Sequence, residues 1–220
     1  MHTEAYLEKD SDYFGWGRPE MLPFIPEGIT SLLDVGCASG AFGAMLKAHR
    51  SIRVTGIEPH QESALAARAR LDHVVHGGAE AAAQELAGQH FDCITFNDVL
   101  EHLVDPWETL RQVRPLLRPG GVIVASIPNV RHLSVSRDYL FNGRWDYQAA
   151  GVLDRTHLRF FTRSSMRDLF TTSGFEVLQQ QGINRSNLTW KLKILSLAIR
   201  DTLEDMRCLQ YVCVARPEVG

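Results

Sequence analysis

Paired metal-binding cysteines, long apolar runs and a large net charge are all missing from this 220-residue sequence. Its four cysteines, Cys37, Cys93, Cys208 and Cys213, lack the spacing of metal ligands and favour a reducing, cytoplasmic compartment. No apolar run reaches the length of a signal peptide or a membrane span. The net charge of −3 gives no overall attraction to nucleic acid, so we do not expect a nucleic-acid partner.

What is present fits one domain with a sizeable core. Hydrophobic residues make up 45% of the sequence, and the mean hydropathy is −0.14. We expect an N-terminal arm with a short helix over residues 1–30, followed by one domain over residues 31–217. Two stretches, near 129–161 and 184–203, exceed a minimal fold and are expected to form a lid over the carboxyl ends of the strands. A monomer and a homodimer both stay open.

Short apolar runs alternate with helix-forming segments along most of the chain. This alternation predicts an α/β fold with a parallel sheet and right-handed crossovers. The expected strands cover residues 31–35, 53–57, 72–76, 91–96, 121–127, 175–178 and 209–215. The expected helices cover 41–48, 61–71 and 80–86, with further helices starting at Asp105 and Thr162, the second ending at Gly174. Asp105 is expected to cap its helix, with Pro106 in the first position and Glu108 reaching back in a capping box.

A glycine loop and a later carboxylate predict a nucleotide-type ligand site. Gly36 and Gly40 follow the first apolar run directly, which lets the backbone turn sharply and approach a ligand. Glu58 stands about twenty residues beyond that loop, at the end of the second strand. In Rossmann-like folds a carboxylate at this place accepts hydrogen bonds from ribose hydroxyls.

Two segments carry a family resemblance. Asp34-Val-Gly-Cys-Ala-Ser-Gly40 resembles the first motif of class I S-adenosylmethionine-dependent methyltransferases, with Ala38 in place of the middle glycine. Phe96-Asn-Asp-Val-Leu-Glu-His-Leu103 resembles the segment after strand four in small-molecule and sugar methyltransferases. The resemblance implies S-adenosylmethionine as cofactor. It also implies a Rossmann-like, doubly wound, seven-stranded and mostly parallel sheet with helices on both faces and an antiparallel last strand.

The same resemblance implies which residues contact the cofactor. Glu58 would accept hydrogen bonds from the ribose, and Asp34 would orient the loop or the tail ammonium group, or simply cap the turn. Arg18 either clamps the cofactor carboxylate or is an ordinary surface arginine. The adenine amino group falls to the Ala79 backbone or to Glu80. The full expected set is Arg18, Asp34, Gly36, Cys37, Ala38, Gly40, Glu58, Pro59, Ala79, Glu80, Asn97, Asp98, Val99 and His102.

Histidine is the expected base, because a hydroxyl acceptor loses a proton during methyl transfer. His157 is the first choice, since Asp154-Arg-Thr-His-Leu-Arg-Phe-Phe-Thr162 resembles a segment of bacterial polysaccharide-associated methyltransferases. Alternatively, His157 bonds a backbone carbonyl and fixes the insertion. His102 is the second catalytic candidate, and Asp154 would orient His157 or contact acceptor hydroxyls. No obvious third donor accompanies His102 and His157 at metal-ligand spacing, so no metal site is expected.

Other residues of the two insertions are expected to meet the acceptor. Asn129 and His132 should point toward the acceptor volume just beyond the fifth strand. Arg155 and Arg159 either neutralise an acidic acceptor or form salt bridges within the lid. The amphipathic, mildly basic segment 190–199 suits a lid helix, a dimer contact or a membrane surface.

These features together predict methyl transfer from S-adenosylmethionine to an oxygen or nitrogen atom of a small molecule. A sugar nucleotide or a lipid-linked glycan is the leading acceptor class. Oxygen is preferred because a base is at hand. Two alternatives stay open. Ala38 and the missing aspartate in Gly77-Gly-Ala-Glu80 would suit a non-catalytic S-adenosylmethionine-binding module, and the glycine loop would suit an NAD(P)-dependent oxidoreductase.

Overall fold

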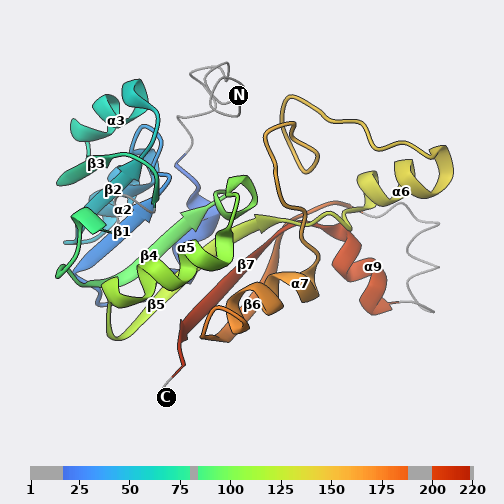
Figure 1. The fold of residues 1–220 in the computed structure, drawn as a ribbon. Helices are drawn as coiled ribbons and strands as arrows, with labels where there is room; N and C mark the ends of the chain where they lie inside the picture. The colour runs from blue at the N-terminus through green and yellow to red at the C-terminus, as the bar shows by residue number, and fades with distance from the viewer. Residues whose placement is uncertain (1–16, 80–83, 188–199, 219–220) are drawn as a thin grey trace.

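A seven-stranded sheet runs through the chain (Figure 1). The structure is a computed structural model that describes residues 17–79, 84–187 and 200–218. The strands are β1 (Ser31–Val35), β2 (Arg53–Glu58), β3 (His73–His76), β4 (Phe91–Asn97), β5 (Leu117–Pro128), β6 (Phe175–Arg185) and β7 (Cys208–Pro217). Their order is β3-β2-β1-β4-β5-β7-β6, with β1 to β5 parallel and β7 antiparallel to both of its neighbours. The expected mostly parallel sheet with an antiparallel last strand is confirmed.

Helices cover both faces of this sheet (Figure 1). Their bounds are η2 (Pro19–Phe24), α2 (Ala41–His49), α3 (Gln61–Arg68), η3 (Leu100–His102), α5 (Pro106–Val113), η4 (Arg114–Leu116), α6 (Leu133–Asn142), α7 (Arg163–Thr171) and α9 (Arg200–Arg207). On one face η2, α2 and α3 bury apolar residues such as Met21 and Leu46. On the other face α5 and α7 do the same with Leu110 and Phe170. Within the described ranges, no helix has the length and apolar character needed to cross a bilayer.

The capping residues predicted from the sequence agree with the observed starts of α5 and α7. The Asp105 carboxylate accepts a hydrogen bond from the Glu108 N–H at 2.8 Å and caps α5. The Glu108 side chain bonds Arg111 and Gln112 instead of reaching back, so the expected capping box is absent there. A capping box does form at the start of α7, between Thr162 and Ser165. Beyond α7, Gly174 adopts the left-handed conformation expected of a helix terminator (φ 82°).

Two strands are longer than their apolar runs indicated. β5 begins at Leu117 and includes Pro119, whereas we expected this strand to begin at residue 121. β6 extends to Arg185 instead of stopping at residue 178. β6 is an edge strand that pairs only with β7, so its exposed side can carry polar residues and the hydrophobic pattern stops before the strand does. The second insertion therefore begins after Arg185, and its expected amphipathic segment, residues 190–199, lies outside the described residues.

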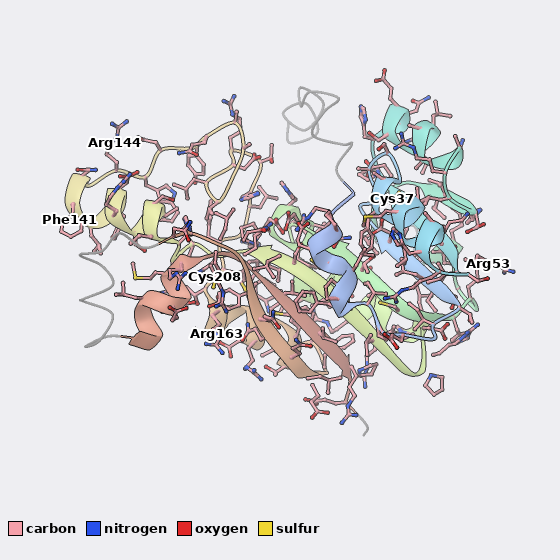
Figure 2. All side chains as sticks on the ribbon, turned by 180° about the vertical axis from the view of Figure 1, so that it is seen from behind. Cys37, Arg53, Phe141, Arg144, Arg163 and Cys208 are labelled. Carbon is pink, nitrogen blue, oxygen red and sulfur yellow. The ribbon has the colours of Figure 1, made fainter. Side chains whose placement is uncertain are left out.

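The insertion between β5 and α7 stands away from the helix-covered sheet (Figure 1). Figure 2 shows Phe141 and Arg144 at its far end, on the opposite side of the molecule from Arg53 of β2. Aromatic contacts hold the loop after α6 together: the Trp145 and Phe160 rings lie 5.4 Å apart, and the Phe160 and His157 rings 6.3 Å apart. This packing places residues 152–159 beside the turn that follows β4.

Candidate active site

The loop after β1 has a left-handed backbone at three positions, a conformation that favours glycine. Gly36, Ala38 and Gly40 all have positive φ, at 70°, 47° and 78°. The N–H groups of Gly36 and Cys37 both donate to the Ile57 carbonyl oxygen, at 2.8 and 3.0 Å, which ties the loop to β2. Gly40 then caps α2, so the loop leads directly into a helix N-terminus. The expected strand, glycine loop and helix are confirmed.

Both the backbone conformation and the lack of space require a glycine at position 36. A Cβ at this position would lie 2.5 Å from Val99 Cγ2. We therefore expect Gly36→Ala to lower the free energy of unfolding by about 2–4 kcal/mol in urea titrations. Gly28→Ala is the matched control, because Gly28 has a similar φ of 74° with no atom within 4 Å of its added Cβ, and it should cost about 1 kcal/mol. Equal losses in the two variants would contradict the steric argument, and Val99→Ala should recover part of the Gly36→Ala loss.

Glu58 braces the same loop from the end of β2. Its carboxylate accepts hydrogen bonds from the Ala38 N–H at 2.9 Å and the His60 N–H at 2.8 Å, and the side chain is fully buried. Burial raises the pKa of Glu58, while the two backbone bonds oppose that rise. The residue expected at the ribose thus lies against the glycine loop. The sequence did not indicate that it also holds the left-handed Ala38 in place.

Asp34 is a buried carboxyl inside β1. Its Oδ1 accepts hydrogen bonds from Thr95 Oγ1 at 2.7 Å and Asn97 Nδ2 at 3.4 Å. Burial is the main cause that raises the pKa of Asp34 to about 7, with a smaller contribution from Glu58. The hydrogen bonds and the positive charge of Arg18 act in the opposite direction. Asp34 is therefore poised to change its charge near neutral pH.

This shifted pKa predicts a pH-dependent stability. The pKa is about 7 in the folded chain and about 3.9 in the unfolded chain, so between these values the folded chain holds an extra proton. The free energy of unfolding should fall as pH rises through that window, by about 1.4 kcal/mol per unit of pKa difference. Asp34→Asn keeps the acceptor oxygen without the proton, so its urea stability should depend less on pH and exceed that of the wild type at pH 8. Asp168→Asn, at an exposed position, is the control, and an unchanged pH slope in Asp34→Asn would contradict the argument.

Arg18 and Asp98 are brought together by the fold. The Arg18 guanidinium bonds the Asp98 carboxylate, Glu20 at 2.6 Å and Ser126 Oγ at 3.2 Å. Gln210 of β7 also donates to both Asp98 oxygens at 2.7 Å. Arg18 and Asp98 each have a left-handed backbone, with φ of 51° and 55°. The arginine expected to clamp a carboxylate is thus already aimed at the carboxyl ends of β4 and β5.

The remaining expected cofactor residues lie at or after the ends of β2, β3 and β4. Asn97 ends β4 beside Asp34, and its buried Oδ1 has no hydrogen-bond partner among the described residues. Val99 packs against Gly36, as noted above. The Pro59 carbonyl oxygen lies 3.1 Å from His76 Nε2. Ala79 packs against the core, and Glu80 lies outside the described residues.

Both expected catalytic histidines lie in one cluster. The rings of His102 and His157 are 4.7 Å apart, edge to face. His157 is buried, its Nδ1 lies 3.0 Å from the Val152 carbonyl oxygen, and its Nε2 lies 4.0 Å from Glu101 Oε1. The contact with the Val152 carbonyl oxygen is the one expected if His157 only fixes the insertion. His102 is only partly buried, and its Nδ1 lies 3.1 Å from the Thr156 carbonyl oxygen.

Asp154 supports this cluster through the loop that follows it. Its Oδ1 accepts hydrogen bonds from the Thr156 N–H at 2.8 Å and from Thr156 Oγ1 at 2.7 Å. Thr156 in turn contacts His102. The Glu101 carbonyl oxygen accepts from the N–H groups of Leu158 and Arg159, at 2.9 and 3.0 Å. These bonds join the insertion to the turn after β4.

The family follows from a comparison with known sequences. Residues 6–180 match the family described as "Methyltransferase domain". The chain belongs to this methyltransferase family. A ubiquinone biosynthesis O-methyltransferase of Aromatoleum aromaticum is 30% identical to the methyltransferase over 169 residues, which cover 72% of this chain and 69% of the relative. One of Aeromonas salmonicida is 25% identical over 171 residues, covering 74% and 70%. A SAM dependent methyltransferase structure from Archaeoglobus fulgidus shares the fold, with a TM-score of 0.69, 17% identity, and 89% and 90% coverage.

The cofactor of this methyltransferase is S-adenosylmethionine, and its site in the structure fits that molecule. The cradle at Gly36 leaves no room for a Cβ, and the unmatched Asn97 Oδ1 can accept a hydrogen bond from an ammonium group. Family membership decides against the NAD(P)-dependent oxidoreductase. It also decides for an enzyme over a binding module.

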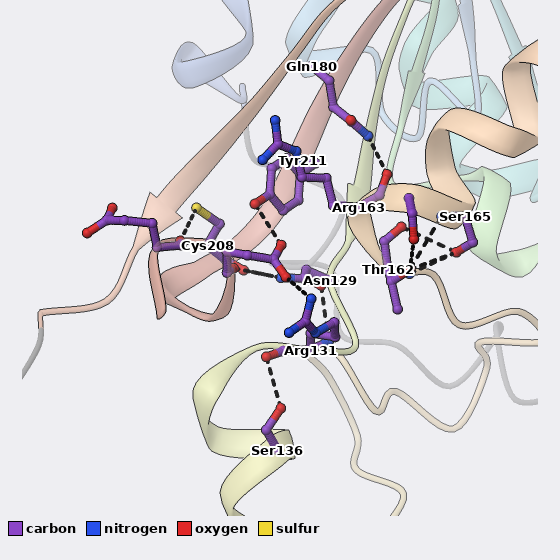
Figure 3. Close-up of polar contacts among 12 residues, drawn as sticks. Asn129, Arg131, Ser136, Thr162, Arg163, Ser165, Gln180, Cys208 and Tyr211 are labelled. Atoms are coloured by element: carbon purple, nitrogen blue, oxygen red, sulfur yellow. Dashed lines mark hydrogen bonds and ion pairs between the residues drawn. The ribbon is translucent and has the colours of Figure 1, made fainter. Parts of the chain in front are cut away.

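Asn129 and His132, which we expected to face the acceptor, make hydrogen bonds within the protein instead. Asn129 is fully buried and donates to the carbonyl oxygens of Asp205 and Cys208, at 3.0 and 3.1 Å (Figure 3). Its Oδ1 accepts from the Arg131 N–H at 3.0 Å, and the Arg131 guanidinium pairs with Asp205 at 2.7 Å. His132 lies 2.9 Å from Ser134 Oγ and 2.8 Å from Ser186 Oγ. These contacts fasten α6 to the start of β7.

Glu101 is the residue of the cluster that sequence reasoning missed. It is 1% exposed, although a glutamate in a Glu-His pair after a strand reads as a surface residue. A signal was present, because it lies in the segment that carried the family resemblance. Donor atoms of Glu101, His102 and His157 all lie within 4.8 Å of one another. The structure therefore supplies the third donor that spacing along the chain did not reveal.

Proposed function

We propose that this methyltransferase transfers the methyl group of S-adenosylmethionine to a hydroxyl oxygen of a small molecule. The observation that carries this proposal is the Glu101–His102–His157 cluster beside the end of β4, close in the chain to Asn97 and Asp98. Carboxylate and imidazole groups are those that activate a hydroxyl, whereas the methyl carbon already carries an activated leaving group. The relatives named above are O-methyltransferases, which supports oxygen over nitrogen.

The cofactor would lie across the carboxyl ends of β1, β2 and β4. Backbone N–H groups of the loop from Gly36 to Gly40 suit the cofactor carboxylate together with Arg18, and Glu58 suits the ribose hydroxyls. Asn97 Oδ1 and Asp34 suit the ammonium group. When bound, S-adenosylmethionine supplies a methyl group activated by the sulfonium. The chain's own residues fix its position and exclude water, which can provide most of the catalysis.

The acceptor would lie between this cofactor position and the insertion after β5. His102 is the partly exposed member of the cluster, so we assign it to the acceptor side. His157, expected to be the base, is buried and sits between Val152 and Glu101, so we assign it a supporting place. A sugar or glycan precursor stays the leading acceptor class, because Arg155 and Arg159 could meet an acidic acceptor or a sugar nucleotide diphosphate.

The test is methyl transfer by the full chain. S-adenosylmethionine with a labelled methyl group would be offered with a panel of sugars, sugar nucleotides, phenols and amines, and products would be separated by mass spectrometry. We expect S-adenosylhomocysteine together with an O-methylated product. Products methylated only on nitrogen would contradict the oxygen assignment, and cofactor binding without turnover on any acceptor would count against the proposal.

We also place the enzyme in the cytoplasm, since Cys37, Cys93, Cys208 and Cys213 are all free thiols.

A further inference from the structure

We propose that Glu101, His102 and His157 bind a divalent first-row transition-metal cation. The three donors come from two segments far apart in the sequence, the 3-10 helix η3 and the insertion between β5 and α7. One donor atom from each lies within 4.8 Å of the other two. The binding site stands on this geometry alone. Its role, described below, rests on the proposed function.

Each of the two imidazoles forms a hydrogen bond through Nδ1, which makes Nε2 the candidate metal ligand. His102 Nδ1 lies 3.1 Å from the Thr156 carbonyl oxygen, and His157 Nδ1 lies 3.0 Å from the Val152 carbonyl oxygen. A carbonyl oxygen can only accept, so in each ring Nδ1 carries a proton, and in the neutral ring Nε2 then carries the lone pair. Metal-bound histidines almost always donate their other ring N–H to a carbonyl or carboxylate in this way.

Charge favours a cation between these donors. The Glu101 side chain is 1% exposed, and its carboxylate faces His157 Nε2 at 4.0 Å. A buried carboxylate beside imidazole nitrogens favours a cation at this place, because the negative charge of the carboxylate is poorly solvated there. Metal–nitrogen bonds of about 2.0–2.1 Å place neighbouring donors roughly 3.4 Å apart, so donor atoms that now lie within 4.8 Å of one another would need to close by up to about 1.4 Å.

The backbone already holds the two segments in register for such a site. Leu158 and Arg159 donate to the Glu101 carbonyl oxygen, and Asp154 fixes Thr156, whose carbonyl oxygen lies beside His102. The Asp154 carboxylate therefore acts on the cluster through the loop that carries an anchoring carbonyl. Outer contacts of this kind set ring orientation in metal sites.

The donor set selects the class of cation. Two imidazoles and one carboxylate suit Zn²⁺, Mn²⁺, Fe²⁺ or Co²⁺ better than Mg²⁺ or Ca²⁺, which prefer oxygen ligands. Three protein ligands leave an open position, as in catalytic zinc sites, and the partly exposed His102 is the member next to solvent. An acceptor hydroxyl bound there would have a lower pKa. Its O–H bond breaks with loss of the proton to solvent, the oxygen bonds the methyl carbon, and the carbon–sulfur bond breaks to leave S-adenosylhomocysteine.

Metal binding to the full chain tests the site directly. The chain would be stripped with a chelator and titrated with Zn²⁺ and Co²⁺ by calorimetry, and the ligand-field absorption of Co²⁺ would be recorded. We expect one equivalent to bind. Glu101→Gln and His102→Asn should each weaken binding at least about a hundredfold, while His73→Asn, at an exposed strand position, should leave it unchanged. Thermal unfolding would establish that each variant is folded, and His102→Asn is the safer variant because that side chain is only partly buried.

The possible outcomes separate this proposal from the proposed function. No bound metal, or binding that Glu101→Gln and His102→Asn leave unchanged, would overturn the metal site. Full methyl transfer by the stripped chain would overturn its role while leaving the methyltransferase proposal intact. Specific metal binding with no O-methyl product on any acceptor would support the site and count against the proposed reaction.

Discussion

Replacing Glu58 with alanine is expected to weaken S-adenosylmethionine binding by about 1.5–3 kcal/mol, roughly a 10- to 150-fold rise in Kd. Two losses combine. The ribose hydroxyls lose a charged acceptor, and the N–H groups of Ala38 and His60 lose the carboxylate that now accepts from both. Because Ala38 is in a left-handed conformation, loss of its hydrogen bond to Glu58 should loosen the loop at this residue, although Gly36 and Cys37 stay bonded to Ile57.

Calorimetry on three variants would separate these contributions. Glu58→Gln retains an acceptor oxygen but removes the charge, so its Kd should fall between those of the wild type and Glu58→Ala. Glu62→Ala changes an exposed glutamate in the first turn of α3 and should leave the Kd unchanged. If the Kd for S-adenosylmethionine were the same in Glu58→Ala and the wild type, the assignment of the ribose to Glu58 would be wrong.

The cofactor half of the fold could be predicted from sequence because its signals are local. β1, the glycine loop, α2 and the carboxylate at the end of β2 lie within 28 consecutive residues, Ser31 to Glu58. A buried strand, residues that tolerate positive φ and a capped helix each leave a mark on neighbouring positions. The antiparallel last strand was expected from the family resemblance alone, since no local pattern distinguishes a parallel strand from an antiparallel one.

The acceptor half could not be predicted because its contacts are long-range. Nothing near Asn129 indicates that its amide will meet the carbonyl oxygens of Asp205 and Cys208. The end of β6 was missed for a similar reason: its polar residues become a strand only because β7 pairs with them. Glu101 is buried where residues 158 and 159 of the insertion bond the turn after β4. Periodicity does not report such placements.

Replacing His157 with asparagine is expected to lower turnover by at least about a hundredfold while leaving the Kd for S-adenosylmethionine unchanged. The ring lies between the Val152 carbonyl oxygen and Glu101, and its edge packs against the ring of His102. Asparagine can still donate to Val152, but it cannot place a nitrogen near the Glu101 carboxylate. Steady-state kinetics with the acceptor found in the panel, together with calorimetry of cofactor binding, would measure the two effects separately.

His132→Asn is the control that makes this result specific. His132 belongs to the same insertion and is buried to a similar degree, at 8% exposed against 7% for His157, and it also contacts two polar partners. A general weakening of the insertion would therefore lower turnover equally in both variants. Loss confined to His157→Asn places the effect at the cluster, because only that variant removes a group beside Glu101 and His102. Equal turnover in His157→Asn and the wild type would remove His157 from acceptor activation and leave it the structural contact to Val152 alone.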